Sequence, residues 1–198
     1  GKGLAAQALH AASARSDHPF VAINCAALPS EMIESELFGH EAGAFVGATR
    51  ARAGKFEHAR RGTIFLDEID SLPLALQAKL LHAVETRSIS RLGSHERIDL
   101  DVRFVAASKT DLETAAANGT FRSDLLYRMN VVTIRMPSLA ERRQDIPILF
   151  LTFVAQMADR YGQPAPRVPG AVLDAIAARD WPGNGWELRN AAERYLLG

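Results

Sequence analysis

A compact apolar run at Thr63–Leu66, ended by two acidic residues, is the feature that most constrains how this chain can fold. A short apolar run without alternation is typical of a strand buried on both faces of a parallel sheet. Further strands are expected at Phe20–Ile23, Arg103–Ala107 and Val131–Ile134. Parallel strands need crossover helices, and helical patterns lie between these runs. They occupy Leu4–Ser13, a segment opened by Pro29, and a segment after Pro73 that carries Leu76, Leu80 and Val84 on one face.

The pattern changes in the second half of the chain. Ser88–Leu92 and Arg97–Leu100 flank Gly93-Ser94 and predict a hairpin. From Ile146 onward only helical patterns occur, separated by proline-rich turns. The sequence therefore predicts a parallel α/β layer at residues 1–142 and a small helical subdomain at residues 143–198. The expected helices of the second part are Ile146–Tyr161, Gly170–Arg179 and Glu187–Leu197.

Composition narrows the possible functions. Among 198 residues, 23 basic residues balance 23 acidic ones, so the total charge does not favour a surface that holds DNA. The single cysteine, Cys25, has no partner at metal-ligand spacing, which argues against a zinc module and indicates a reducing cytoplasm. We expect it to be a buried small residue. No apolar run approaches the roughly 20 residues of a membrane helix, so no membrane partner is expected.

Two short patterns are compatible with a nucleotide site. Gly1-Lys2 before a helix matches the tail of a phosphate-binding loop, although an ordinary surface lysine is the alternative. Asp67-Glu68 follows the apolar strand, and ligands of open α/β sheets gather at such strand ends. There an aspartate can bind Mg²⁺ and a glutamate can deprotonate an attacking water. Two solvated carboxylates that cap the next helix are the alternative.

Two arginines and one loop allow both a functional and an ordinary interpretation. Arg122 and Arg128 are surface cations by default, but an arginine can stabilise a transferred phosphoryl group across a subunit interface. The segment Gly43–Ala48 interrupts a helical pattern with glycines and a central Phe45. Either Phe45 packs into the core, or it is an exposed anchor for a partner.

Together these residues resemble the central AAA+ domain of sigma-54-dependent transcription activators, the NtrC family, and within it the DctD-like response regulators. The resemblance covers essentially the whole chain, and Gly43–Ala48 stands at the family's GAFTGA loop. It implies a P-loop AAA+ fold: a three-layer parallel sheet, whose first strand lies outside this chain, followed by a helical lid. The other matching motifs are Asn24–Leu28, Glu34–Glu41, Phe65–Ile69, Phe121–Asn130, Glu141–Ile146 and Trp181–Asn184.

The resemblance implies a site for ATP and Mg²⁺. Gly1 and Lys2 would hold the phosphates, and Asp67 would hold Mg²⁺. Glu68 would activate the attacking water. Asn24 would hold Glu68 away from that water until the assembly reaches a competent state.

The resemblance also implies partners. Arg122 and Arg128 match arginine fingers that reach into a neighbour's site, and Arg103 matches an interface residue, so the working form would be a homo-oligomeric ring, hexamer or heptamer. The hairpin around Gly93 would move with the GAFTGA-like loop, and the loop would contact the sigma-54 RNA polymerase holoenzyme. DNA would be contacted only through a domain outside this chain. The loop comprises Gly43, Ala44, Phe45, Val46, Gly47 and Ala48.

Four positions depart from the family's pattern. Gly3 stands where the family has glutamate, a change that costs about 1 kcal/mol in a helix. Val46 replaces the loop's threonine and lacks its hydroxyl. Lys109 replaces the first sensor's asparagine but could reach a phosphate, and Trp186 replaces the second sensor's arginine but could stack on adenine.

The expected function is that of an ATP hydrolase which drives transcription activation by remodelling closed promoter complexes of sigma-54 polymerase. The alternative is a degenerate AAA+ regulatory or oligomerisation module without remodelling activity.

Overall fold

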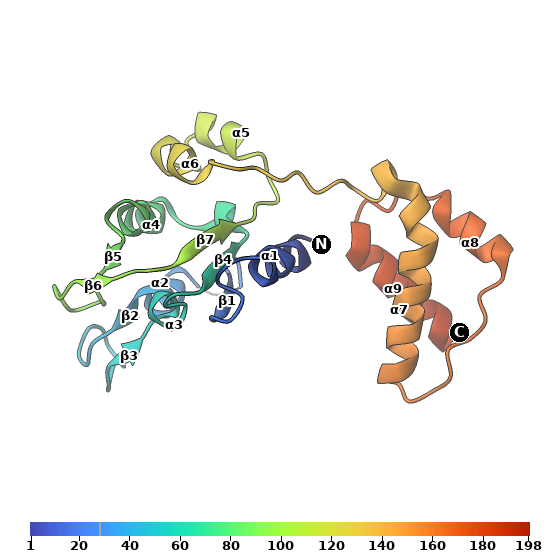
Figure 1. Ribbon diagram of the computed structural model, residues 1–198, viewed down its shortest axis with the longest axis horizontal. Helices are drawn as coiled ribbons and strands as arrows, with labels where there is room; N and C mark the ends of the chain where they lie inside the picture. Colours follow the sequence, from blue (N-terminus) through green and yellow to red (C-terminus); the bar gives the residue numbers. More distant parts are fainter. Residues whose placement is uncertain (28) are drawn as a thin grey trace. The chain divides into compact units, whose positions relative to one another are not determined.

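The computed structural model describes residues 1–27 and 29–198, and the chain divides into two compact units (Figure 1). One unit comprises Lys2–Thr133, and the other comprises Ile134–Gly198 together with Gly1. This division lies ahead of the boundary between residues 142 and 143 that the sequence predicts. That boundary stays a prediction. Leu28, the last residue of one family motif, lies outside the described residues.

A parallel sheet forms the centre of the first unit. Strand β4 (Thr63–Asp67) lies between β1 (Phe20–Asn24) and β7 (Arg103–Ala106). Asn24 pairs with Asp67 in register, so the carboxyl ends of these neighbouring strands meet at one edge of the sheet. The first four residues of β4 are buried, which confirms the predicted strand and its burial on both faces.

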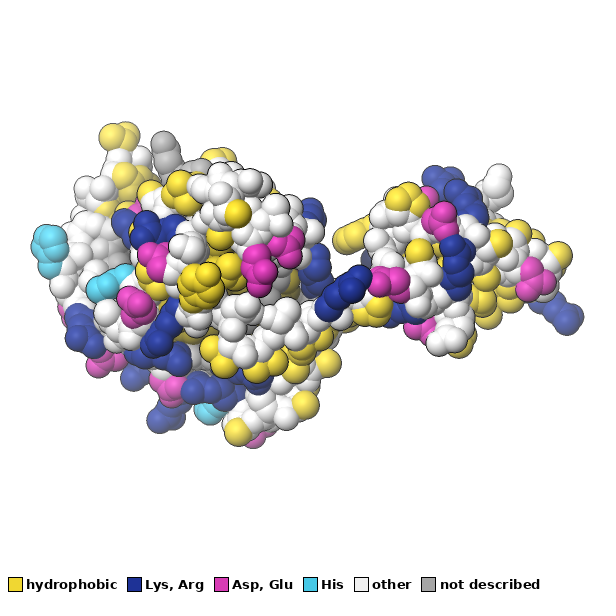
Figure 2. Space-filling model, turned by 90° about the horizontal axis from the view of Figure 1, so that it is seen from above, with side chains coloured by type: hydrophobic (Ala, Val, Ile, Leu, Met, Phe, Trp, Pro, Cys, Tyr) yellow, Lys and Arg dark blue, Asp and Glu magenta, His cyan; other side chains and the backbone are white. Residues whose placement is uncertain are grey.

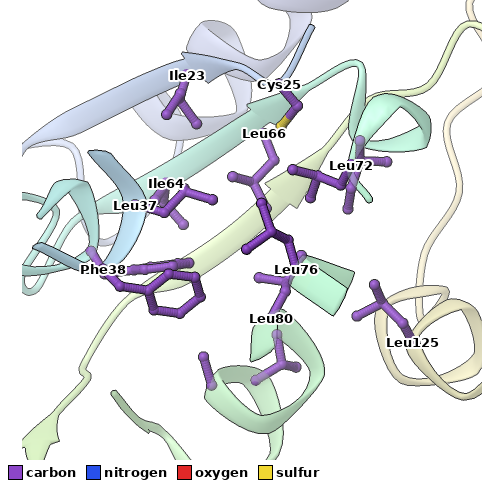
Figure 3. Packing of buried hydrophobic residues seen from close by; sticks show 14 of the residues in the cluster. Ile23, Cys25, Leu37, Phe38, Ile64, Leu66, Leu72, Leu76, Leu80 and Leu125 are labelled. Carbon is purple, nitrogen blue, oxygen red and sulfur yellow. The ribbon is translucent and has the colours of Figure 1, made fainter. Parts of the chain in front are cut away.

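One face of the sheet is covered by the predicted amphipathic helix α4 (Leu74–Thr86). Ile64 and Leu66 of β4 pack in the same cluster as Leu76 and Leu80 of α4 (Figure 3). Alternate residues of a strand point to opposite faces, so the intervening residues of β4 must be covered from the other side.

Helix α1 (Lys2–Ala11) covers that second face and makes the fold three layers deep. His10, near the end of α1, has its Nδ1 atom 2.9 Å from Oγ1 of Thr63 at the start of β4. Gly3, near the beginning of α1, lies beside the ring of Phe65. Helix and strand therefore run in opposite directions, and the amino terminus of α1 lies toward the carboxyl end of β4.

Two small antiparallel pairs extend the first unit. The pair β5 (Ser88–Ile89) and β6 (Ile98–Asp99) confirms the predicted hairpin, although the paired parts are shorter than expected. The pair β2 (Gly39–His40) and β3 (Arg52–Ala53) brackets the glycine-rich loop. The remaining elements of this unit are α2 (Ser30–Phe38), α3 (Lys55–His58), the 3₁₀ turn η1 (Ile69–Ser71), α5 (Leu112–Ala117) and α6 (Ser123–Met129).

The strand predicted at Val131–Ile134 is wrong. The segment has no strand assignment, and the side chains of Val131, Val132 and Ile134 are exposed. A β-strand is stabilised by its ladder, and among the described residues no strand pairs with this segment. The apolar pattern alone therefore did not specify a strand.

The second unit contains helices only, as predicted. Helices α7 (Ile146–Arg160), α8 (Gly170–Ala177) and α9 (Asn184–Leu197) follow the 3₁₀ turn η2 (Ala140–Asp145). Trp181 is part of the core between these helices: its side chain is buried, and its Nε1 donates to the carbonyl of Ile176 at 2.7 Å. The other buried residues of this core are Leu139, Ile146, Phe150, Val154, Leu188 and Ala192.

The surface carries both signs of charge. Basic and acidic side chains are interspersed on the face seen in Figure 2, in keeping with their equal numbers in the sequence. Within the described residues, no helix has the length and apolar character needed to cross a membrane.

Candidate functional site

The chain turns sharply where β4 ends. Glu68 follows Asp67, the last residue of the strand, and has a left-handed backbone with φ 56° and ψ 47°. Such a conformation is uncommon outside glycine and is held here by hydrogen bonds. The amide of Glu68 donates to Oδ1 of Asp67 at 3.1 Å, and the amide of Ile69 donates to the carbonyl of Ala107 at 3.0 Å. The turn places Glu68 at the edge where the strands' carboxyl ends meet.

Two donors bind the same oxygen of Glu68. Nδ2 of Asn24 lies 3.2 Å from Oε1, and Nζ of Lys109 lies 2.8 Å from it. The Asn24 amide is oriented because its Oδ1 accepts the backbone N–H of Ala26 at 2.8 Å, which turns the NH₂ group toward Glu68. The structure thus brings together three residues that the sequence analysis assigned separately to one site.

Hydrogen bonding and charge at this oxygen alter the protonation equilibria. The hydrogen bond from Lys109 lowers the pKa of Glu68, and the bond from Asn24 adds to this effect. The same pairing raises the pKa of Lys109. Glu68 is therefore ionised and Lys109 is charged at neutral pH.

Asp70 fixes the loop that carries Lys109, a role that was not predicted from the sequence. Its Oδ1 accepts the backbone amide of Lys109 at 3.4 Å, and its Oδ2 accepts the hydroxyl of Thr110 at 3.0 Å. Burial raises the pKa of Asp70, but these hydrogen bonds and one from Ser108 outweigh burial and lower it overall. The only signal in the sequence was a third acidic residue shortly after Asp67-Glu68.

The same edge has features that suit a phosphate and a divalent cation. The amino terminus of α1, which begins at Lys2, lies toward the carboxyl end of β4, and helix amino termini favour anions. Among the described residues, no cluster of three or more His, Cys, Asp or Glu could enclose a metal ion. Mg²⁺ is commonly bound by one or two carboxylates plus substrate phosphates, so the single carboxylate of Asp67 fits that mode.

The glycine-rich loop forms a closed tip. The amide of Gly43 donates to the carbonyl of Ala48 at 2.8 Å, and both Gly43 and Gly47 have positive φ. Phe45 is 47% exposed and contacts His40 edge to face, with ring centroids 5.0 Å apart, while Val46 is fully exposed. Of the two alternatives for Phe45, the structure therefore supports an exposed position.

The loop is linked to the β5–β6 hairpin. The amide of Glu41 donates to the carbonyl of Leu92 at 3.0 Å, and the amide of Leu92 donates to the carbonyl of Gly39 at 3.0 Å. Gly93 fits closely, since a Cβ there would lie 2.9 Å from the Cβ of Ala44. A displacement of either loop therefore changes contacts of the other.

Arg91 reinforces this link, although no motif in the sequence points to it. Its Nη1 lies 2.9 Å from Oε1 of Glu41, and its Nε and Nη2 bind the carboxylate of Glu57. No periodic pattern in the sequence marks Arg91, Glu41 and Glu57, because these residues are brought into contact only in the folded structure.

Comparison with known proteins places this geometry in a family. The family described as the sigma-54 interaction domain matches residues 1–135. The chain belongs to the sigma-54 interaction domain family. Residues 140–197 match the AAA+ ATPase lid domain, so the predicted family and the predicted AAA+ fold with a helical lid are both confirmed.

Curated relatives of this sigma-54 interaction domain are bacterial regulators. The chain is 52% identical over all 198 residues to the C4-dicarboxylate transport transcriptional regulatory protein DctD of Pseudomonas aeruginosa, and covers 43% of that protein. It is 50% identical to the transcriptional regulatory protein ZraR of Salmonella typhimurium, over 100% of the chain and 45% of ZraR. The chain thus spans less than half the length of these relatives.

Solved structures agree with the family assignment. The crystal structure of NtrX from Brucella abortus has a TM-score of 0.94 at 37% identity, and the match covers 100% of the chain and 44% of NtrX. NtrX in complex with ATP matches with a TM-score of 0.90, also at 37% identity, over 100% of the chain and 42% of that protein.

The arginines expected at subunit interfaces of this family lie elsewhere on the first unit. Arg122 pairs with Asp124 through its Nε and Nη2, at 3.0 and 2.6 Å, and this pairing raises the pKa of Arg122. Arg128, in the last turn of α6, is exposed, and Nη1 of Arg103 lies 3.4 Å from the carbonyl of Leu9. Among the hydrogen bonds of the described residues, none joins these arginines to Glu68. Their interface role stays a prediction.

The nucleotide-binding roles expected of Gly1 and Trp186 also stay predictions. Gly1 is exposed and is grouped by its contacts with the helical unit. Trp186 is 75% exposed, and the guanidinium of Arg189 lies 5.9 Å from the centre of its ring. An exposed indole has a free face on which an aromatic group could stack.

Proposed function

We propose that this chain is the ATP-driven motor of a sigma-54-dependent transcription activator. The arrangement at Glu68 carries the proposal: an ionised carboxylate held by Asn24 and Lys109 at the carboxyl edge of a parallel sheet, next to a second carboxylate. Phosphoryl transfer to water needs positioning, charge neutralisation and a group that orients the water. The residues at this edge have the chemistry for each task.

Each residue has a defined part in the proposed reaction. ATP with Mg²⁺ would supply the phosphoryl group that is transferred to water. Lys2 and the first amides of α1 would hold phosphates, and Asp67 would hold the cation. Asn24 and Lys109 both bind Oε1 of Glu68 in this structure, and once Glu68 is released in the competent state its carboxylate would accept the proton of the attacking water.

The proposed partners are inferred from the glycine-rich loop and from the related proteins. The exposed Phe45 and Val46 form an apolar tip suited to grip a protein, and the proposed partner is sigma-54 RNA polymerase in the cytoplasm. Arg122 and Arg128 would act in a neighbouring subunit's site, so the working form is a closed homo-oligomeric ring, hexamer or heptamer. The structure reported for NtrX with ATP supports nucleotide binding by this domain.

Steady-state ATP hydrolysis by the full-length protein tests the catalytic part. Wild type is expected to turn over ATP, and Glu68→Gln should lower kcat by about a hundredfold or more because the general base is lost. Nucleotide binding, followed by a fluorescent ATP analogue, should persist in this variant. The matched control is Glu113→Gln on α5, an exposed position where kcat should not change. Wild type without turnover, or Glu68→Gln with normal turnover, would contradict the proposal.

A degenerate AAA+ module without remodelling activity is the second candidate. It is favoured by Val46, which presents no hydroxyl at the fully exposed loop tip, and by Lys109, which forms an ion pair with Glu68. The discriminating measurement is opening of a sigma-54 promoter by the full-length protein. This candidate predicts nucleotide binding without promoter opening.

A further inference from the structure

The side chain of Lys109 forms an ion pair with Glu68, the group proposed to take the proton of the attacking water. Its Nζ lies 2.8 Å from Oε1 of Glu68, the oxygen that Asn24 also binds. We propose that Lys109 is a positioning residue which, together with Asn24, holds Glu68 in a resting orientation and so restrains hydrolysis. This inference rests on the proposed function and specifies how its site is regulated.

The position of Lys109 is set by its backbone. Asp70 binds the amide of Lys109 and the hydroxyl of Thr110, and the amide of Ala107 donates to the carbonyl of Leu66 at 2.9 Å. Lys109 therefore lies in a loop that follows β7 and is hydrogen-bonded to β4. A flexible surface lysine would lack these restraints.

The pair is also partly sheltered from solvent. The side chain of Glu68 is only 17% exposed, whereas that of Lys109 is 66% exposed, so the lysine reaches over the carboxylate from the solvent side. An ion pair between two exposed groups contributes little, but a sheltered carboxylate with a second hydrogen bond is held more firmly. Lys109 can therefore be withdrawn toward solvent while Asn24 stays in place.

Removing this restraint has a definite consequence. A charged donor bound to Oε1 limits the movement of the Glu68 side chain, so its loss frees the carboxylate to reorient toward water. Lys109→Met keeps an unbranched side chain of nearly the same length but removes the charged amine. It is expected to raise the basal kcat for ATP about threefold to tenfold, with KM changed less than about twofold.

The kinetic test uses the full-length protein without sigma-54 polymerase. Lys109→Arg, which keeps a charge, should return kcat toward the wild-type value. In the double variant with Asn24→Ala, the two effects should not add, because both donors bind one oxygen. The control is Lys79→Met, which removes a lysine paired with Glu34 on α2, away from this edge, and should leave kcat unchanged.

A second test needs no nucleotide. Reductive methylation followed by mass spectrometry measures the reactivity of each lysine amine in the intact protein. Glu68→Gln is expected to speed modification of Lys109 about threefold, because the ion pair is lost, and to leave Lys79 unchanged. Equal modification rates of Lys109 in wild type and Glu68→Gln would overturn the inference.

The two proposals fail in different ways. If wild type does not hydrolyse ATP, or if Glu68→Gln is fully active, the proposed function fails, while methylation still reports the Lys109–Glu68 contact. If wild type is active, Glu68→Gln is inactive, and Lys109→Met has an unchanged or lower kcat, then the restraint alone is refuted.

Discussion

Arg91 binds both carboxylate oxygens of Glu57, with Nε 2.9 Å from Oε1 and Nη2 2.7 Å from Oε2. Its remaining terminal nitrogen binds Glu41, at the base of the glycine-rich loop. One guanidinium thus joins the hairpin, α3 and the loop that presents Phe45. A planar guanidinium suits this geometry better than an ammonium would, since it makes paired, directional bonds.

Loss of Arg91 should destabilise the domain. In Arg91→Ala, two partly buried carboxylates keep their charges without this partner, which is expected to cost about 1 to 2 kcal/mol of unfolding free energy. Urea unfolding followed by circular dichroism measures the change. Arg97→Ala is the matched control, because its ion pair with Asp99 is exposed and should contribute less than about 0.5 kcal/mol. Equal effects of the two substitutions would contradict this role for Arg91.

The same ion pair should make stability depend on pH. The hydrogen bond from Arg91 lowers the pKa of Glu57 below its ordinary value of about 4.5, so the carboxylate stabilises the folded state above that pH. This stabilisation is lost as the pH falls through the lowered, folded-state pKa. The difference in unfolding free energy between wild type and Arg91→Ala should therefore shrink in acid. A difference that stays constant down to about pH 3 would count against the pairing.

The contact between α1 and β4 depends on a buried polar pair. Thr63 and His10 are both buried, and their side chains lie 2.9 Å apart. Thr63→Val keeps the shape but leaves the imidazole without this partner, so it should destabilise the domain by about 1 to 3 kcal/mol. Thr152→Val on α7 removes an exposed hydroxyl and should change stability by less than about 0.5 kcal/mol. Thermal unfolding of the two variants tests the difference.

Cys25 should resist alkylation in the folded protein. Its side chain is buried, and burial, reinforced by the nearby charge of Asp67, raises the pKa of the thiol to about 12. The thiolate is the reactive form, so little of it exists at neutral pH. Iodoacetamide labelling is expected to follow unfolding in urea with the midpoint seen by circular dichroism. Rapid, complete labelling of the native protein would contradict this account.

Much of the fold could be predicted because local pattern and tertiary environment agree. Ile64–Leu66 is apolar throughout and Thr63–Leu66 is buried throughout, and α4 buries the face that its spacing indicated. Val131–Ile134 shows the opposite case, since an apolar run without a partner strand stays exposed. A sequence pattern describes one segment, whereas a strand also needs a neighbouring strand to pair with its backbone.

The candidate site was only partly accessible from sequence. Asn24 and Glu68 were assigned roles through resemblance, and the structure brings them within 3.2 Å, although their catalytic roles stay predictions. The Lys109–Glu68 pair and the Arg91 cluster were not foreseen. Both depend on side chains that meet across long separations in sequence, which neither periodicity nor motif spacing encodes.

The apolar tip of the loop should matter for partner contact and not for stability. Phe45→Ala removes a half-exposed ring, so unfolding free energy should change by less than about 1 kcal/mol while sigma-54-dependent activity is lost. Basal ATP hydrolysis should remain, because the loop lies outside the Glu68 site. Loss of basal hydrolysis together with partner contact would show that the ring of Phe45 has a different role.

Val46→Thr tests whether the missing hydroxyl limits the protein. Val46 is fully exposed, so this change should alter stability by less than about 0.5 kcal/mol. Promoter opening should stay within about threefold of wild type if the apolar tip alone is sufficient for grip. A gain from no activity to strong activity would favour the degenerate module instead.

The central claim is most directly tested by open-complex formation on a sigma-54-dependent promoter, with full-length protein, sigma-54 polymerase and ATP. We predict that wild type forms heparin-resistant open complexes, that the non-hydrolysable analogue AMP-PNP does not support them, and that Glu68→Gln forms none with ATP. Open complexes that form equally well with Glu68→Gln, or a wild type that hydrolyses ATP but opens no sigma-54 promoter, would contradict the assignment of this chain as an ATP-driven activator motor.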